Sequence, residues 1–213
     1  MPRNIFLMSI LNMVLALNAH AENVNESLVE KAKTKISEVV LPENSKLVYQ
    51  EEVASKSCML AYVTQIYSVE SEAAVVCNEI YSPLTNKGWK SFYGCQTKKY
   101  PFKKRPIDGN RESFEYANFS AGVEDGKFGI SFSARPSNSL GLKHFELSEW
   151  AEQNAIPEAK KNGKAYFYLS YRYRESKEIY EAKCPENSME CECTRHSYIK
   201  RILGKNETVV RDQ

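Results

Sequence analysis

Apolar residues recur along the chain with two different periods, and the period separates predicted helices from predicted strands. Every third or fourth position is apolar from Leu28 to Val39 and again from Ala73 to Leu84, as in helices that pack on one side. Alternating or continuous apolar runs, which are typical of strands, fill most other stretches. The predicted strands are 46–54, 57–69, 90–98, 113–122, 127–135 and 164–174, followed by a final hairpin of 177–183 and 194–203.

Polar residues, glycine and proline separate these runs. The Asp-Gly pair within 124–127 tolerates the positive φ of a hairpin turn. The second helix is expected to be capped by Ser68, kinked or restarted at Pro83, and ended by Gly88. A weaker helix over 148–162 is expected to break near Pro157 and stop at Gly163.

These elements together predict an α+β fold. We expect a mainly antiparallel sheet with two or three helices packed on it, stabilised by disulfides. The stretch 57–69 is apolar on both faces and is therefore expected to lie at the centre of the sheet.

The first twenty-one residues have the three parts of a cleavable secretory signal. A positive start at Arg3 precedes an apolar run over 5–17, and Ala19 and Ala21 form a small-x-small cleavage site. The apolar run is shorter than the roughly 20 residues that span a bilayer. We therefore expect export to the periplasm, cleavage after Ala21, and no stable membrane anchor.

The polar joint at 136–141 is the predicted boundary between two parts of the exported chain. These are an N-terminal α+β half, 22–136, and a C-terminal half of one helix and three strands, 142–213, packed as one compact unit. Each half contains a helix followed by three strands, which suggests a duplication, although no residue-level repeat supports it.

Six cysteines follow the signal, and an oxidising compartment favours disulfides for all of them. They form two clusters of three, Cys58, Cys77 and Cys95, and Cys184, Cys191 and Cys193. Because three is odd, either one bridge joins the clusters or one cysteine in each stays free. The last three with His196 also resemble a zinc ligand set, but their spacing and the compartment favour disulfides, so no metal or cofactor is expected.

No catalytic motif is present. The sequence lacks G-x-S-x-G, H-E-x-x-H, a phosphate-binding loop and a dinucleotide-binding glycine motif. Only His144 and His196 remain after the signal is removed, so an enzyme acting on cell-wall glycan or peptide would use one of them as acid or base. The net charge of +2 gives no general attraction to nucleic acid, which we exclude as a partner.

Two stretches are predicted recognition surfaces. The first is a basic and aromatic loop stiffened by prolines, and the second is the outward face of the 164–174 strand, where tyrosine and arginine alternate. Both residue types are enriched at protein interfaces. The predicted partner-binding residues are Lys98, Lys99, Tyr100, Phe102, Lys103, Lys104, Arg105, Tyr166, Tyr168, Arg172 and Arg174. The alternatives are a solvated loop that protects a sheet edge and a sheet face covered by a helix.

The sequence therefore favours a periplasmic binding protein without catalytic activity. An inhibitor or immunity protein that neutralises an envelope-acting toxin is one form of this function, with a protein of the cell envelope as its partner. The alternatives are an envelope enzyme and a structural or assembly factor of the envelope.

Overall fold

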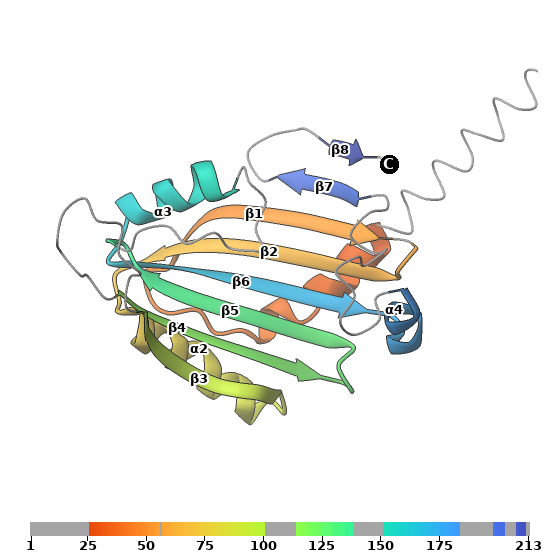
Figure 1. The fold of residues 1–213 in the computed structure, drawn as a ribbon, viewed down its shortest axis with the longest axis horizontal. Helices are drawn as coiled ribbons and strands as arrows, with labels where there is room; N and C mark the ends of the chain where they lie inside the picture. The colour runs from red at the N-terminus through yellow and green to blue at the C-terminus, as the bar shows by residue number, and fades with distance from the viewer. Residues whose placement is uncertain are drawn as a thin grey trace, which may run out of the picture.

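The computed structural model describes residues 26–55, 57–100, 114–138, 151–183, 198–202 and 208–211. In chain order the elements are a helix at 26–33, η1 Ile36–Glu38, β1 Lys46–Ser55, β2 Leu60–Val69, α2 Ala73–Asn86, β3 Lys90–Tyr100, β4 Phe114–Val123, β5 Phe128–Pro136, η2 Ala151–Ala155, α3 Ile156–Lys161, β6 Ala165–Arg174, α4 Lys177–Lys183, β7 Tyr198–Ile202 and β8 Thr208–Arg211. The strands form an antiparallel sheet in the order β3-β4-β5-β6-β2-β1-β7-β8 (Figure 1). The predicted α+β class with an antiparallel sheet is confirmed.

Strand β2 lies inside the sheet, as its apolar sequence predicts. It pairs with β6 on one side and β1 on the other, and every residue except Tyr62 is buried. The strand begins at Leu60, three residues later than expected, because Met59 has a φ of 49° and belongs to the preceding turn. Burial of both faces explains why β2 has almost no polar alternation.

The β4–β5 hairpin has the turn that its Asp-Gly pair predicts. Glu124, Asp125 and Gly126 have φ values of 54°, 52° and 82°, and the Lys127 N–H donates to the Glu124 carbonyl at 2.9 Å. The strands continue from the pair Val123 and Phe128. Positive φ at consecutive positions gives the turn the twist of the strands it joins.

One face of the sheet, which we call the core face, packs against α2 and the 26–33 helix. Helix α2 runs along β3, β4 and β5 (Figure 1) and buries one apolar side, including Val76, Ile80 and Leu84. Stacked and tilted aromatic rings continue this core across the sheet, with centroid separations of 5.0 Å for Phe119 and Phe132 and 5.7 Å for Phe132 and Phe167. Burying several such side chains, each worth about 1.5–3 kcal/mol, holds helix and sheet together.

A chain of polar side chains crosses the core face beneath the 26–33 helix. Tyr67 Oη donates to Gln65 at 2.9 Å, Gln65 donates to Gln50 at 2.7 Å, and Gln50 donates to Glu52 at 2.9 Å. Lys33 of the helix completes the chain with an ion pair of 2.8 Å to Glu52. Burial raises the pKa of Tyr67 to about 12, so its phenol remains a donor. Each buried polar group in the chain therefore has a partner, which is the condition for burying it without a large cost.

Glu51 and Glu52 are adjacent carboxylates of β1, and both are buried. They are 9% and 7% exposed. They lie on opposite faces of β1, where Glu52 pairs with Lys33 and Glu51 accepts a hydrogen bond of 2.6 Å from Tyr49 Oη. The two-residue period of a strand therefore places the neighbouring carboxylates on opposite faces.

Element η1 is attached to the end of α2 through Glu38. Its carboxylate receives the Trp89 indole N–H at 2.8 Å and Lys35 at 2.8 Å, and its carbonyl receives Lys87 Nζ at 2.6 Å. Burial opposes ionisation of Glu38, but the hydrogen bonds from Lys35 and Trp89 outweigh it and leave the pKa lowered. This contact fixes the N-terminal segment against the helix end, where Gly88 has the positive φ of 84° expected of a terminating glycine.

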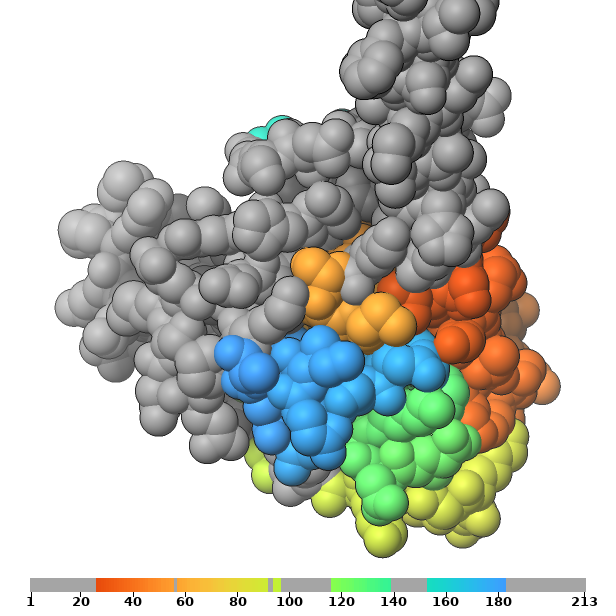
Figure 2. Space-filling view, turned by 90° about the vertical axis from the view of Figure 1, so that its right-hand side faces the viewer, coloured from red at the N-terminus to blue at the C-terminus, as the bar shows by residue number. Residues whose placement is uncertain are grey.

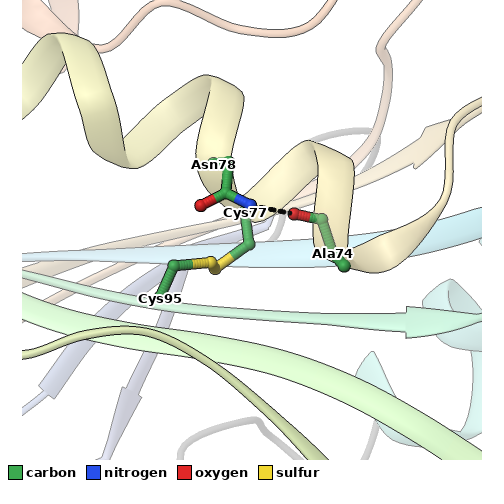
Figure 3. The surroundings of a disulfide bond; sticks show 4 residues. All are labelled: Ala74, Cys77, Asn78 and Cys95. Atoms are coloured by element: carbon green, nitrogen blue, oxygen red, sulfur yellow. Dashed lines mark hydrogen bonds between the residues drawn. A yellow bond between two sulfur atoms is a disulfide. The ribbon is translucent and has the colours of Figure 1, made fainter.

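A disulfide between Cys77 of α2 and Cys95 of β3 joins helix and sheet (Figure 3). Their Cα atoms are 6.0 Å apart, and the two cysteines are separated by 18 positions in the sequence. Fully buried Cys58 is also disulfide-bonded. Cys184, Cys191 and Cys193 lie outside the described residues.

The predicted strand over 177–183 is wrong, because this segment is helix α4. Ser176 Oγ accepts the Ile179 N–H at 3.3 Å, and Lys177 and Glu181 form an ion pair of 3.4 Å one turn apart. The helix cap and the ion pair one turn apart favour a helix more strongly than the short apolar pattern favours a strand. The expected hairpin partner, β7, pairs instead with β1 and β8.

The other helix boundaries also differ in detail. Ser68 does not cap α2, because β2 continues to Val69 and Glu72 precedes the helix. Helix α2 continues through Pro83. The N-terminal helix ends at 33, earlier than the apolar period predicts, and continues as η1 after a turn.

Candidate recognition face

The second face of the sheet, which we call the polar face, carries the predicted tyrosines and arginines of β6. Strand registers place hydroxyl, phenol and guanidinium groups beside one another across β4, β5, β6, β2 and β1. The three central rows are Asn118, Ser133, Tyr168, Ile66 and Tyr49; Ser120, Ser131, Ser170, Thr64 and Glu51; and Gly122, Gly129, Arg172, Tyr62 and Val53. The core face carries the alternate residues of the same strands, which are largely apolar. The two faces therefore differ in chemistry although both contain buried side chains.

Helix α3 covers one end of the polar face. Tyr166, Ile66 and Tyr49 form an apolar cluster with Ile156 and Ala159 of this helix. Tyr166 is 2% exposed. This predicted partner-binding residue is therefore part of an internal contact, as the covered-face alternative expects.

Helix α4 covers the other end of the polar face. Its Tyr180 packs with Cys58, Leu60 and Tyr62, and the Arg174 guanidinium lies 5.4 Å from the centroid of the Tyr180 ring. Figure 2 shows this end of the molecule, with α4 against the strands. The two outer rows thus contact the two short helices in part, and the Ser120 row lies between them.

Hydroxyl groups line the centre of this strip. Thr64 Oγ1 and Ser170 Oγ are 3.2 Å apart, and both residues are buried. Tyr168, Ser131 and Arg172 beside them are half-buried. The centre of the strip therefore combines a satisfied hydroxyl pair with larger polar groups that retain solvent exposure.

Arg172 and Arg174 lie across the glycines of the neighbouring hairpin. A Cβ added to Gly129 would come within 3.0 Å of Arg172 Nη2 and 3.2 Å of its Nε, and one added to Gly126 would come within 3.1 Å of Arg174 Nη2. Glycine at these positions leaves room for the guanidinium groups to lie against the strand. Arg174 Nη2 also donates to the Gly126 carbonyl at 3.3 Å.

The two guanidinium groups affect each other electrostatically. Burial and the charge of Arg172 lower the pKa of Arg174, and the carboxylate of Glu181 partly opposes them. The Nε atoms of both arginines are buried and have no hydrogen-bond partner. Arginine nevertheless remains protonated in proteins, so this end of the strip holds two adjacent positive charges.

The second predicted surface, the basic loop, begins in strand β3. Lys98, Lys99 and Tyr100 pair with β4 at the sheet edge. Phe102, Lys103, Lys104 and Arg105 lie outside the described residues, as do His144, His196 and the signal segment 1–21. Strands β4 and β5 lie between β3 and β6, so at the usual strand spacing β3 and β6 are about 14 Å apart. The two predicted surfaces thus begin on well-separated strands.

Sequence reasoning missed the partners of β6 on the polar face. Thr64 was hidden in an apolar run, whereas Ser131 and Ser133 alternate with Ile130 and Phe132 and were recognisable as one face of a strand. The register between strands brings them beside Tyr168 and Ser170. Alternation assigns residues to faces, but it does not identify neighbours across a sheet.

A surface pocket of about 490 Å³ lies apart from the polar face. It is lined by Val40, Leu41, Pro42, Glu43, Asn44, Glu70, Ser71 and Glu79. None of these residues belongs to the predicted surfaces or to the central rows. The pocket therefore adds no group to the recognition face.

Within the described segments, no group of three or more histidine, cysteine, aspartate or glutamate side chains is arranged to hold a metal ion. No helix among the described residues is long and apolar enough to cross a membrane. No family model, curated protein or solved structure matches the chain.

Proposed function

We propose that the protein is exported to the periplasm and acts there as a non-catalytic binding protein for a protein of the cell envelope. The observation that carries this proposal is the central part of the polar face, where Tyr168 and Arg172 retain solvent exposure between α3 and α4. Tyrosine and arginine are the residue types that most often dominate binding energy at protein interfaces.

The rigid body beneath this face supports the same function. The sheet is backed by α2, and the Cys77–Cys95 disulfide joins the two layers. A preorganised surface loses little conformational freedom on binding, which favours tight association. An inhibitor or immunity protein that neutralises an envelope-acting toxin fits this combination of rigidity and interface chemistry.

Photo-crosslinking tests the binding face. A photoreactive phenylalanine analogue replaces Tyr168 in one variant and Val75 of α2, which is 45% exposed, in the control. In intact cells we expect one adduct of discrete mass at position 168 and none at position 75. Identical adducts at both positions, or none at either, would contradict a binding function for the polar face.

N-terminal sequencing tests export. The proposal expects the purified periplasmic protein to begin at Glu22, directly after the predicted cleavage site. Recovery of the intact N-terminus in the cytoplasm would contradict the proposed location.

A further inference from the structure

We infer that Arg172 and Arg174 form a binding site for the carboxylates of an acidic, extended segment of a partner protein. This inference rests on the proposed function and specifies the chemistry of the partner. It concerns the end of the polar face nearest α4, where the guanidinium groups lie over Gly129 and Gly126.

Within the part of the chain that the structure describes, the two arginines lack a carboxylate in ion-pair contact. Neither Arg172 nor Arg174 forms an ion pair with a carboxylate of the described residues, whereas Lys31, Lys33 and Lys35 all do. Glu181, whose negative charge acts on Arg174, is already paired with Lys177 at 3.4 Å. Among the described residues, the repulsion between the two guanidinium groups is therefore only partly offset by Glu181, and an anionic ligand would relieve it.

The spacing of Arg172 and Arg174 along β6 also matches that of side chains in an extended peptide. Arg172 and Arg174 are two residues apart on one face of β6, a separation of about 7 Å along a strand. Carboxylates at alternate positions of an extended peptide have the same spacing. Each guanidinium can hold a carboxylate through two parallel hydrogen bonds, which fixes orientation as well as charge. The matching ligand is a segment with acidic residues at positions i and i+2.

The surroundings favour a polypeptide over a small anion. Tyr62 is the cross-strand neighbour of Arg172, and the Tyr180 ring lies against the Arg174 guanidinium. Half-buried Tyr168 continues the strip beyond the arginines. These groups provide apolar contact and hydrogen bonding along the length of a chain, as protein interfaces do.

The test uses a synthetic peptide of alternating glutamate and serine, with a glutamine-serine peptide as the uncharged reference. Binding is measured by isothermal titration at low and at physiological ionic strength. We expect the acidic peptide to bind the wild-type protein. The double variant Arg172→Gln with Arg174→Gln should bind this peptide at least about tenfold more weakly. Arg172→Lys keeps the charge but loses the bidentate geometry, so it should also weaken binding.

The matched control is Lys161→Gln with Lys164→Gln, which removes the same charge from exposed positions elsewhere. Its affinity should remain within about twofold of wild type, because distant surface charges are screened. Equal losses in both double variants would overturn the site in favour of non-specific attraction. Inorganic phosphate that displaces the peptide at equimolar concentration would overturn the carboxylate assignment.

Failure of this inference can be distinguished from failure of the proposed function. If the acidic peptide does not bind the wild type but the crosslink at position 168 persists, the carboxylate site is wrong and the binding face stands. Loss of the crosslink as well would reject both. Unchanged urea unfolding midpoints of the arginine variants ensure that a lost affinity reports on the site.

Discussion

The ion pair between Lys33 and Glu52 is expected to attach the N-terminal helix to the sheet, and its two partners should not be equivalent. The Glu52 side chain is 9% exposed and has the Gln50 amide as its other partner. Lys33 is 30% exposed and retains Glu30 at 2.9 Å if Glu52 is changed. Removing the lysine therefore leaves a buried carboxylate with one neutral donor, whereas removing the carboxylate charge leaves a lysine that is still paired.

This difference sets the expected magnitudes. Lys33→Met should lower the free energy of unfolding by about 3 kcal/mol, near the lower end for breaking a buried pair. Glu52→Gln should lower it by about 1–2 kcal/mol, because the amide still accepts the Gln50 hydrogen bond. The double variant should cost less than the sum, with a coupling energy of about 1–2 kcal/mol.

Urea unfolding followed by tryptophan fluorescence measures these values. Trp89 is 3% exposed and donates a hydrogen bond to Glu38 of η1, which follows the N-terminal helix. Its emission therefore reports on unfolding of this part of the protein. The matched control is Lys177 with Glu181, which are 60% and 50% exposed and should couple by about 0.5 kcal/mol or less. Additive effects at Lys33 and Glu52, or a coupling as small as the control, would refute the role of this pair.

Three further predictions follow from other contacts. Gly163→Ala should destabilise the protein by about 1–3 kcal/mol, because its Cβ would lie 2.4 Å from the Val69 carbonyl oxygen. Gly94→Ala is the control, because its Cβ would meet only the Tyr81 side chain, no closer than 3.4 Å. Equal urea midpoints for the two variants would contradict the close approach at Gly163. Replacing Cys77 and Cys95 by alanine should cost about 3 kcal/mol for a loop of this size, and an unchanged midpoint under non-reducing conditions would argue against the bridge. Because hydrogen bonds lower the folded-state pKa of Glu38 below 4.5, its stabilisation should be complete above pH 4.5 and lost as pH falls through the folded pKa. Glu38→Gln should therefore flatten the acid limb of the stability curve, and an unaltered slope below pH 4.5 would exclude this contribution.

Local features of the fold were predictable because they depend on nearby residues. The β4–β5 turn followed from Asp125 and Gly126, and the burial of β2 followed from its apolar sequence. Helix α4 was misassigned because a short segment with Ile179 and Tyr180 fits a strand pattern, while its cap at Ser176 decides the outcome.

The arrangement of the strands was not predictable in the same way. Pairing of β1 with β7 joins segments separated by much of the chain, and no local period encodes it. The predicted face of β6 correctly grouped Tyr168 with Arg172, but Thr64 and Ser131 join them only through the registers of β2 and β5. Gly163 directly follows the end of α3, as expected, but its close approach to Val69 was not predictable from the sequence.

The most direct test of the binding face is the crosslinking yield at position 168 in cells, compared between the wild-type background and Arg172→Gln with Arg174→Gln. We predict that the discrete adduct forms in the wild-type background and falls at least about tenfold when both guanidinium groups are removed. The Lys161→Gln and Lys164→Gln background should retain the adduct. An adduct that is equally abundant in all three backgrounds would contradict recognition through these arginines.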